Sequence, residues 1–285
     1  MTVASPNAPS KLNWRRMLVI TRTDLRQLRQ SRDFWIPMAI LAGLFFVVLP
    51  TLLLLALGTA QRVEVVRQIG ATLEILPRRV QEQVQGQTPL AKAQYAMAVY
   101  LFAPLAVVVP LTISTAVGAN TIVGEREKGT GEFLAHSPAN ENEIYVGKLI
   151  ASLLPGFFAT YIGFAIYSVV VNLIVGPKVG GWFFPTAEWW ILMFWVVPPF
   201  IALALSFVVR ISSRVKSAAA AQQASGLVTL PLILLAAGQS SGALFGAGAA
   251  GWLLGFAAWL GAILGLIRGR RAVDRERLLG VDPNA

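Results

Sequence analysis

The chain has 285 residues, of which 55% are hydrophobic and only 13% are charged, about half the roughly 25% charge of an average soluble domain. This composition argues against a soluble metabolic enzyme and predicts a surface that largely faces lipid. The absence of cysteine and the single histidine, His136, exclude disulfides, thiol catalysis and a His-rich metal site, while the net charge of +10 is attributed to membrane topology and anionic headgroups, not to nucleic acid.

The first predicted element is an amphipathic helix from Lys11 to Arg32. Its apolar positions recur at steps of three and four residues, with arginines elsewhere on the wheel; they are Trp14, Leu18, Thr21, Leu25 and Leu28. Because this helix leads directly into an apolar run, we expect it to lie flat in the inner headgroup layer. Residues 1–33 are thus predicted to be a cytoplasmic tail and an interfacial helix.

Five runs that carry no charged residue follow, with 28, 32, 29, 21 and 51 residues. A membrane crossing needs about 20 apolar residues, so the last run is long enough for two, divided at a polar break in residues 238–242. The sequence therefore predicts an all-α polytopic membrane protein with a six-span domain in residues 34–267. The spans are Trp35–Leu57, Gln94–Ala119, Ile144–Val175, Trp189–Val209, Ala218–Ala237 and Ala243–Ile267. A re-entrant hairpin remains the alternative for the last pair.

Lysine and arginine are unevenly distributed over the segments that join these spans. With the N-terminus inside, 18 of the 24 fall on the cytoplasmic side, including those of the basic tail 268–285, and six fall outside. This asymmetry predicts that both termini are cytoplasmic, in a plasma or inner membrane. The outer segment 62–92 has apolar residues about every 3.5 positions and predicts an amphipathic helix or helix pair broken near Pro77. That segment rests on the membrane surface, packs on the outer mouth or meets another subunit.

Proline and glycine recur inside the predicted spans. Each proline removes a helix donor, so kinks are expected where neighbours satisfy the freed carbonyls; the prolines are Pro104, Pro110, Pro155, Pro198, Pro199 and Pro231. Near the C-terminus, Gly251, Gly255, Gly261 and Gly265 have the four-residue spacing that lets helices approach closely in lipid. The contact is either within the subunit or to a partner.

The chain offers no energy source of its own. Residues 124–130 have the spacing of a phosphate loop but lack its lysine. No ionisable residue lies centrally in a predicted span, which argues against a proton relay or an ion-coupled carrier. We predict no catalytic residue, no metal site and no cofactor in this chain.

The most specific stretch is the loop 120–143, between the second and third spans on the cytoplasmic side. A charged helix is expected to stop at Gly129, and Thr130 is expected to cap a short helix over Gly131–Ala135. Ser137 is expected to cap the next helix, with Pro138 at its first position.

The short helix presents Phe133 and Leu134 among acidic residues. Such a protruding helix suits a groove on a soluble partner. A charged loop that merely stops two helices is the other interpretation.

From Gly124 to Thr130 the chain reads Gly-Glu-Arg-Glu-Lys-Gly-Thr, followed by Glu132, Leu134, Ser137-Pro138, Glu143 and Gly147-Lys148. This stretch resembles the signature of type-2 ABC transporter permeases, and the six-span pattern with a basic N-terminal helix resembles that family along nearly the whole chain. The resemblance implies that the loop carries a coupling helix that contacts the ATP-binding subunit, beside a connecting helix at the N-terminus.

The implied contact residues are Glu125, Glu127, Gly129, Thr130, Glu132, Phe133, Leu134 and Pro138. Gly131 departs from the family pattern, in which a larger apolar residue stands, and this predicts a smaller contact. The resemblance further implies two ATP-binding subunits, which hold ATP and Mg²⁺, and a second permease copy or a homologue in the lipid bilayer.

Kinked spans without internal charge suit a hydrophobic or amphipathic substrate, and its export is implied by the resemblance alone. The alternative is a non-transporting subunit that couples ATPase motion to an outer partner or signal through segment 62–92. A passive channel would instead need polar faces through the spans.

Overall fold

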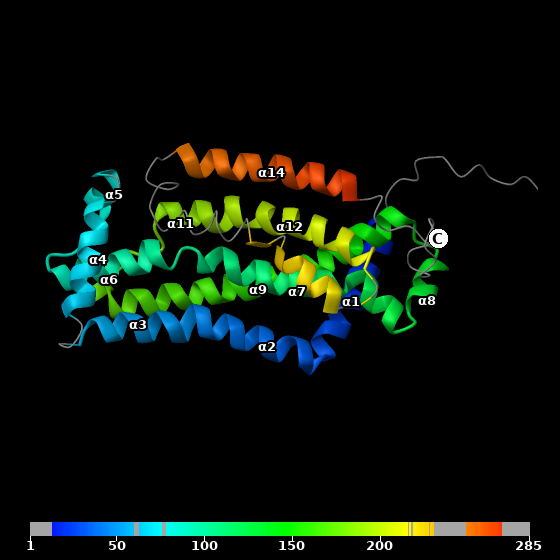
Figure 1. The fold of residues 1–285 in the computed structure, drawn as a ribbon, viewed down its shortest axis with the longest axis horizontal. Helices are drawn as coiled ribbons and strands as arrows, with labels where there is room; N and C mark the ends of the chain where they lie inside the picture. Colours follow the sequence, from blue (N-terminus) through cyan, green and yellow to red (C-terminus); the bar gives the residue numbers. More distant parts are fainter. Residues whose placement is uncertain are drawn as a thin grey trace, which may run out of the picture.

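The computed structural model describes residues 13–59, 63–75, 78–215, 217, 219–227, 229–230 and 249–269. These residues form α-helices and short π-helical turns, without a β-strand among them, in one long bundle (Figure 1). Five helical runs are long and apolar enough to cross a membrane. The prediction of an all-α, multi-pass membrane protein is confirmed.

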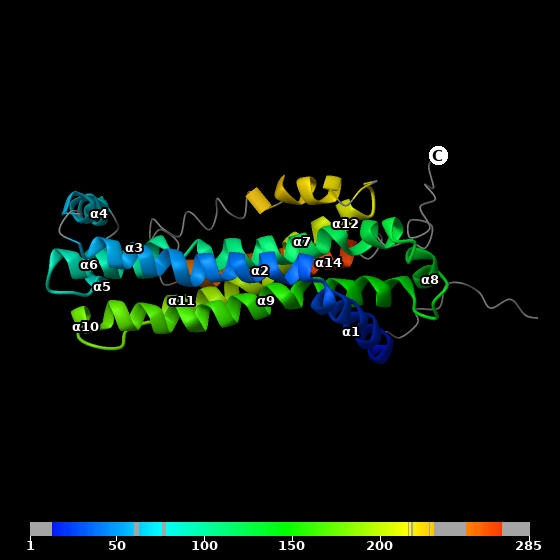
Figure 2. The ribbon, with the colours of Figure 1, turned by 90° about the horizontal axis from the view of Figure 1, so that it is seen from below.

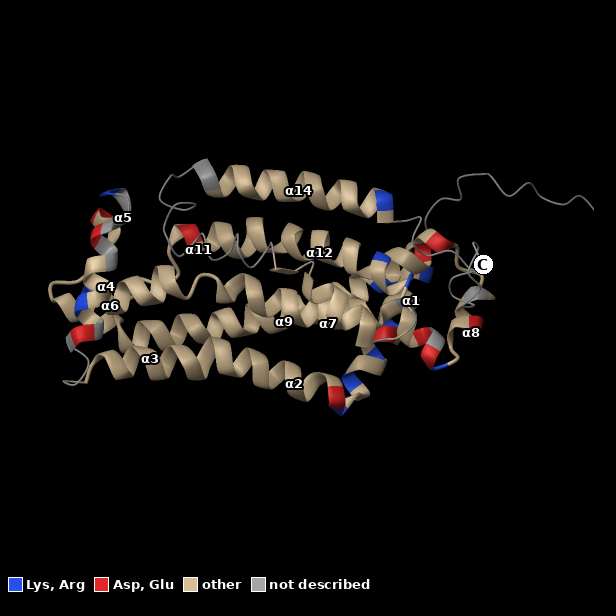
Figure 3. Cartoon of the chain, viewed as in Figure 1, with Lys and Arg blue, Asp and Glu red and all other residues tan. Residues whose placement is uncertain are grey.

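The five runs overlap five of the six predicted spans. They are Arg32–Leu57, Pro89–Thr121, Glu141–Ile174, Ala187–Ser212 and Gly251–Gly269. Of the remaining predicted span, Ala218–Ala237, residues 219–227 and 229–230 are described and helical, and the others lie outside the described residues; the count of six stays a prediction. Figure 3 shows the charged residues of the described chain gathered at the two ends of the bundle, with an uncharged middle.

The first helix lies obliquely across one end of the bundle (Figure 2). It is α1 (Trp14–Gln30), and it ends at Ser31, whose extended backbone turns the chain into α2 (Arg32–Gly43). A π-helical turn, η1 (Leu44–Val48), and α3 (Leu49–Leu57) complete the first run.

The apolar stripe predicted for α1 is divided between buried and exposed positions. Met17 and Thr21 are buried, whereas Trp14 and Leu18 are 65% and 57% exposed. The prediction assigned one apolar face, but the helix has two: one packs on protein, and the other is left for lipid, which the apolar pattern alone does not separate.

The next two described helices after this run lie across the opposite end of the bundle (Figures 1 and 2). They are α4 (Val63–Ile75) and α5 (Arg78–Gln83), within the segment predicted to form a helix pair; Pro77 lies outside the described residues. The chain then enters the bundle as α6 (Pro89–Ala96), the π-helical turn η3 (Met97–Leu101) and α7 (Leu105–Glu127).

The break between η3 and α7 contains Pro104. Side chains of neighbouring helices bond two backbone carbonyls of η3, just before the break. The Tyr167 hydroxyl donates to the Ala98 carbonyl at 2.6 Å, and the Trp189 indole donates to the Val99 carbonyl at 2.8 Å. In lipid a backbone group without a partner costs several kcal/mol, so these two aromatics make an irregular helix tolerable inside the span.

The rest of the described chain contains three runs along the bundle. The elements are α8 (Gly131–Ala135), α9 (Glu141–Ile174), α10 (Gly176–Val179), α11 (Ala187–Ile191), η4 (Leu192–Val196), α12 (Val197–Ser212) and α14 (Ala249–Gly269). The three runs are formed by α9, by α11 to α12, and by α14. The helix α7 packs against α9 and α12, and α14 covers α12 (Figure 1).

Glycines allow close contacts between these helices, as expected where lipid gives no hydrophobic driving force. A Cβ at Gly156 of α9 would lie 2.9 Å from the Pro110 carbonyl of α7. A Cβ at Gly163 would lie 2.7 Å from Cγ of Phe46, in η1. Both distances are too short for a real side chain, so α9 depends on glycine at these positions.

The four glycines proposed for helix packing lie on α14. Gly251 is buried. A Cβ at Gly255 would clash with the Trp195 ring, and one at Gly265 would lie 3.2 Å from Cβ of Ser206. Gly261 makes ordinary contact with Leu203. The structure thus places Gly255, Gly261 and Gly265 against helices of the same chain.

Candidate functional site

The loop before α9 projects from the end of the bundle that carries α1 (Figure 1). Gly129 has a φ of +69°, the left-handed conformation that glycine adopts at little cost at a helix end. The Thr130 amide then bonds the Glu125 carbonyl at 2.9 Å. The stop at Gly129 and the helix at Gly131–Ala135 therefore lie where the sequence predicted them.

The short helix α8 exposes one large apolar side chain. Phe133 is 81% exposed, and Glu127, Glu132 and Pro138 are also exposed. Leu134 instead packs partly against the core, so it does not form an apolar pair with Phe133. Gly131 is buried.

Both predicted caps around α8 are wrong in detail. The Thr130 side chain caps nothing: its hydroxyl bonds the carbonyl and the carboxylate of Glu125. Asn140, not Ser137, caps α9, because the Glu143 amide donates to Asn140 Oδ1 at 2.8 Å and the Asn140 amide donates to the Glu143 carboxylate at 3.1 Å. This reciprocal capping box satisfies two orphan amides at once.

The same Glu143 fastens α1 to the loop. Its side chain is 1% exposed and accepts a bond from the Asn13 amide at 2.8 Å. The Arg16 guanidinium lies 3.8 Å from the Glu143 carboxylate and donates to the Pro138 carbonyl at 2.8 Å. The start of α1 is thus bonded both to the loop before α9, at Pro138, and to the first turn of α9, at Glu143.

One turn further along, α1 lies directly on α9. The Thr21 hydroxyl donates to the Gly147 carbonyl at 2.9 Å. A Cβ at Gly147 would lie 3.1 Å from Cβ of Ile20 and 3.2 Å from the Met17 carbonyl. Glycine at this position therefore allows the two backbones to approach.

This close approach brings three charged side chains together. The Lys148 ammonium lies 2.7 Å from the Glu125 carboxylate of α7 and 3.3 Å from the Asp24 carboxylate of α1. Lys148 is 2% exposed, against 18% for Glu125 and 20% for Asp24. We call these three residues the charge triad; it joins α1, α7 and α9.

The two carboxylates of the triad respond differently to their surroundings. Burial raises the pKa of Asp24 above its ordinary value, because the attraction of Lys148 does not offset it and Glu125 adds repulsion. Burial also disfavours the charge of Glu125, but attraction to Lys148 and hydrogen bonds from Lys148 and Thr130 outweigh it and hold the Glu125 pKa below its ordinary value. One ammonium cannot neutralise two carboxylates fully, and it favours the charged form of the nearer carboxylate, Glu125, more strongly.

The sequence did not indicate Asp24; it included Lys148 only in the family signature, without a role, and placed Glu125 among the surface acids. A signal was available: Asp24 is the one acid within α1, and Lys148 immediately precedes 29 uncharged residues. From its sequence neighbours alone, each residue is expected to be a solvent-exposed charge. Their pairing could therefore not be assigned before the helices were placed.

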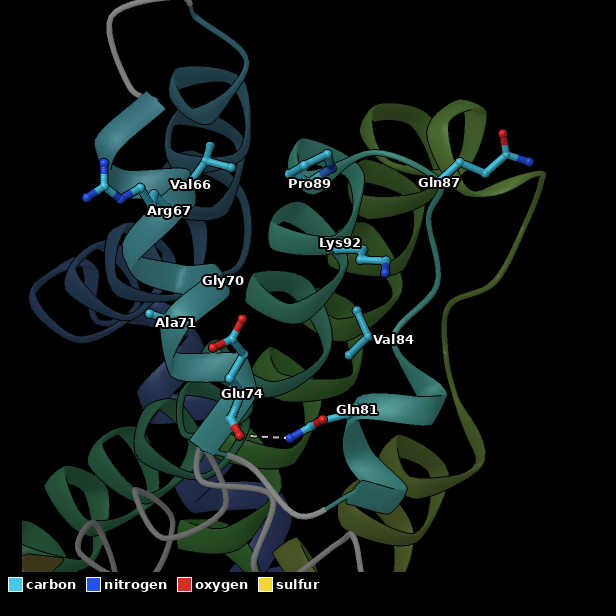
Figure 4. A pocket seen from close by; sticks show the side chains of 10 residues that line it. All are labelled: Val66, Arg67, Gly70, Ala71, Glu74, Gln81, Val84, Gln87, Pro89 and Lys92. Atoms are coloured by element: carbon cyan, nitrogen blue, oxygen red, sulfur yellow. Dashed lines mark hydrogen bonds between the residues drawn. The ribbon is translucent and has the colours of Figure 1, made fainter.

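The opposite end of the bundle holds a hollow of about 660 Å³ between α4, α5 and α6. Val66, Gly70 and Val84 contribute apolar lining, and the Glu74 and Lys92 side chains extend toward the hollow from different walls (Figure 4). Gln81 donates to the Glu74 carbonyl at 2.9 Å and so joins α5 to α4.

Comparison with known proteins bears on the whole chain. The family profile described as "ABC-2 family transporter protein" matches residues 18–251, from α1 to the start of α14. No curated protein matches the chain.

Proposed function

Because this chain belongs to the ABC-2 transporter family, we propose that it is the membrane-spanning permease subunit of an ATP-binding cassette transporter. A separate ATPase subunit, present in two copies, binds ATP and Mg²⁺ and drives it. A second permease copy or a homologue completes the pathway. The observation that carries the proposal is the 81% exposed Phe133, held at the tip of a loop that is bonded to three helices.

In this proposal α8 is the coupling helix. Phe133 enters an apolar groove of the ATPase, as one anchor of a helix-in-groove contact, and the exposed acids Glu127 and Glu132 face basic groups around it. Glu125 and Thr130 act behind this surface, since they bond one another and Glu125 belongs to the charge triad. Gly129 and Pro138 shape the loop.

Movement of α8 then reaches the membrane helices through defined bonds. Glu143 joins the loop to α1, and Lys148 joins α9 to α7 and α1. A displacement of the loop therefore moves these three helix ends together. In this arrangement the α8 end is cytoplasmic, where the lysine and arginine excess lies, and α4 and α5 lie outside.

The substrate class follows from the described spans, whose central parts carry no charged residue. Burying a charged substrate against such helices is costly. We assign a hydrophobic or amphipathic substrate, exported from the cytoplasmic side.

The test replaces the exposed aromatic at each end of the bundle. Phe133→Ala should weaken copurification with the ATPase subunit by about 30-fold, because a central aromatic anchor contributes about 2 kcal/mol, and ATP-driven transport in vesicles should fall. Trp182→Ala, between α10 and α11, removes a side chain of similar exposure (68%) and should change neither.

The purified chain alone should not hydrolyse ATP. Wild-type assembly and transport by the Phe133→Ala protein, or hydrolysis by the chain without a partner, would contradict the proposal.

A second candidate function is a non-transporting subunit that passes ATPase motion to an outer partner. The hollow between α4 and α6 favours it, since Glu74 and Lys92 line one open space (Figure 4). Vesicle assays separate the two functions: the first requires ATP-dependent movement of a lipid-like substrate by the purified complex, and the second requires ATP hydrolysis without it.

A further inference from the structure

The elbow between α1 and α2 forms an apolar groove against the side of α9. Its volume is about 290 Å³. Pro155 is buried, and Phe34 and Met38 are half-buried within it, whereas Trp35 and Phe158 are 43% and 62% exposed at its sides. The groove is therefore open along one side and built almost entirely of hydrocarbon.

One charged residue stands on this groove. Arg29 is exposed and lines it, one turn after Arg26 and two turns after Arg22 on the same helix. Among the described residues, no carboxylate forms an ion pair with any of these three arginines. The one acid of α1, Asp24, is instead turned toward Lys148. Asp33, in the first turn of α2, is exposed, and its carboxylate lies outside the groove lining.

The position of the groove along the bundle is also informative. Lys148 is the last charge of α9 before 29 uncharged residues, and the groove contacts α9 at Pro155, just beyond it. On the same helix as Arg29, Trp14 and Leu18 are exposed, as is typical of a helix that lies at a membrane interface. Arg29 thus lies where headgroups meet acyl chains, with hydrocarbon on its membrane side.

We propose that this groove binds one anionic phospholipid of the inner leaflet. An acyl chain fills the space between Met38 and Phe158, and the Arg29 guanidinium binds the phosphate, which matches its planar fork of donors. A zwitterionic lipid offers the same chain and phosphate but adds a cation, which Arg29 at the groove repels. The site goes beyond the proposed transport function and requires only that the chain is embedded in a membrane.

The experiment measures bound lipid on the full-length purified protein by native mass spectrometry. Phosphatidylglycerol and phosphatidylcholine with identical acyl chains are titrated against the wild type and three variants. We expect one tightly held phosphatidylglycerol per chain. Arg29→Gln should weaken it about fivefold, as one interfacial arginine contributes about 1 kcal/mol. Arg22→Gln, an equal charge change off the groove, should leave it unchanged.

Met38→Trp fills the groove and should remove the tightly held lipid of either headgroup; Leu25→Trp serves the same purpose from α1 if the first variant does not purify. Excess inorganic phosphate should not displace the lipid, because the acyl chain contributes most of the binding. Equal losses in Arg29→Gln and Arg22→Gln, equal retention of the two lipids, or unchanged binding in both groove-filling variants would overturn the proposal.

Discussion

Replacing Lys148 with methionine should be among the most damaging single changes at the α8 end of the molecule. The substitution keeps the length and apolar stem of the side chain but removes an ammonium that is 2% exposed and lies 2.7 and 3.3 Å from two carboxylates. Glu125 and Asp24 are then left facing each other without a counter-charge.

The magnitude follows from the burial of the three partners. Removing one partner of a buried ion pair costs about 3–5 kcal/mol. Because Glu125 and Asp24 retain about a fifth of their side-chain exposure, water recovers part of their hydration. We therefore expect a loss near the lower limit, about 3 kcal/mol in the free energy of unfolding.

The assay is reversible unfolding of the purified protein by a denaturing detergent, followed by tryptophan fluorescence. The decisive comparison is a triple variant, Lys148→Met with Glu125→Gln and Asp24→Asn. Neutralising all three groups removes the stranded charges, so this protein should recover more than half of the lost stability. A Lys148→Met protein within about 0.5 kcal/mol of wild type, or a triple variant no more stable than the single one, would refute the role of the triad.

Two further outcomes test the electrostatics and the packing. The Glu125 pKa is lowered, so Glu125→Gln should lose stability at neutral pH and approach wild type as the pH falls through the lowered Glu125 pKa. The Asp24 pKa is raised, so Asp24→Asn should gain stability relative to wild type as the pH rises through the raised Asp24 pKa. Thermal unfolding from about pH 2 to about pH 8 covers both windows, and parallel profiles would contradict this assignment. Gly163→Ala should destabilise by about 1–3 kcal/mol because its Cβ meets Phe46, while Gly70→Ala, which meets nothing within 4 Å, should not; equal melting temperatures would contradict the packing argument.

The spans and α8 could be predicted from the sequence because their causes are local. A bilayer disfavours each charged residue individually, so uncharged runs mark spans wherever they occur. Gly129 ends α7 through its own conformational freedom, with a φ of +69°. Five predicted spans and the helix Gly131–Ala135 accordingly match the structure.

The two caps beside α8 were predicted incorrectly for different reasons. Ser137 and Asn140 are both good capping residues, and Asn140 caps α9 because Glu143 completes the capping box and is itself bonded by Asn13, 130 residues away. Thr130 bonds Glu125 instead of a helix amide. The spacing of Asn140 and Glu143 is thus a local signal that the assignment of Ser137 overlooked, and only the added bond from Asn13 required the position of α1.

Only the tertiary structure decided which charges are buried and which face outward. Lys148 lies 124 residues from Asp24 and 23 from Glu125 along the chain, and only the packing of α1 on α9 at Gly147 brings the three together. A buried charge needs a partner, and here the partners come from different helices, so Glu125 turns inward from the loop where the sequence placed it on the surface. Phe133 has no such partner within the described chain and stays exposed.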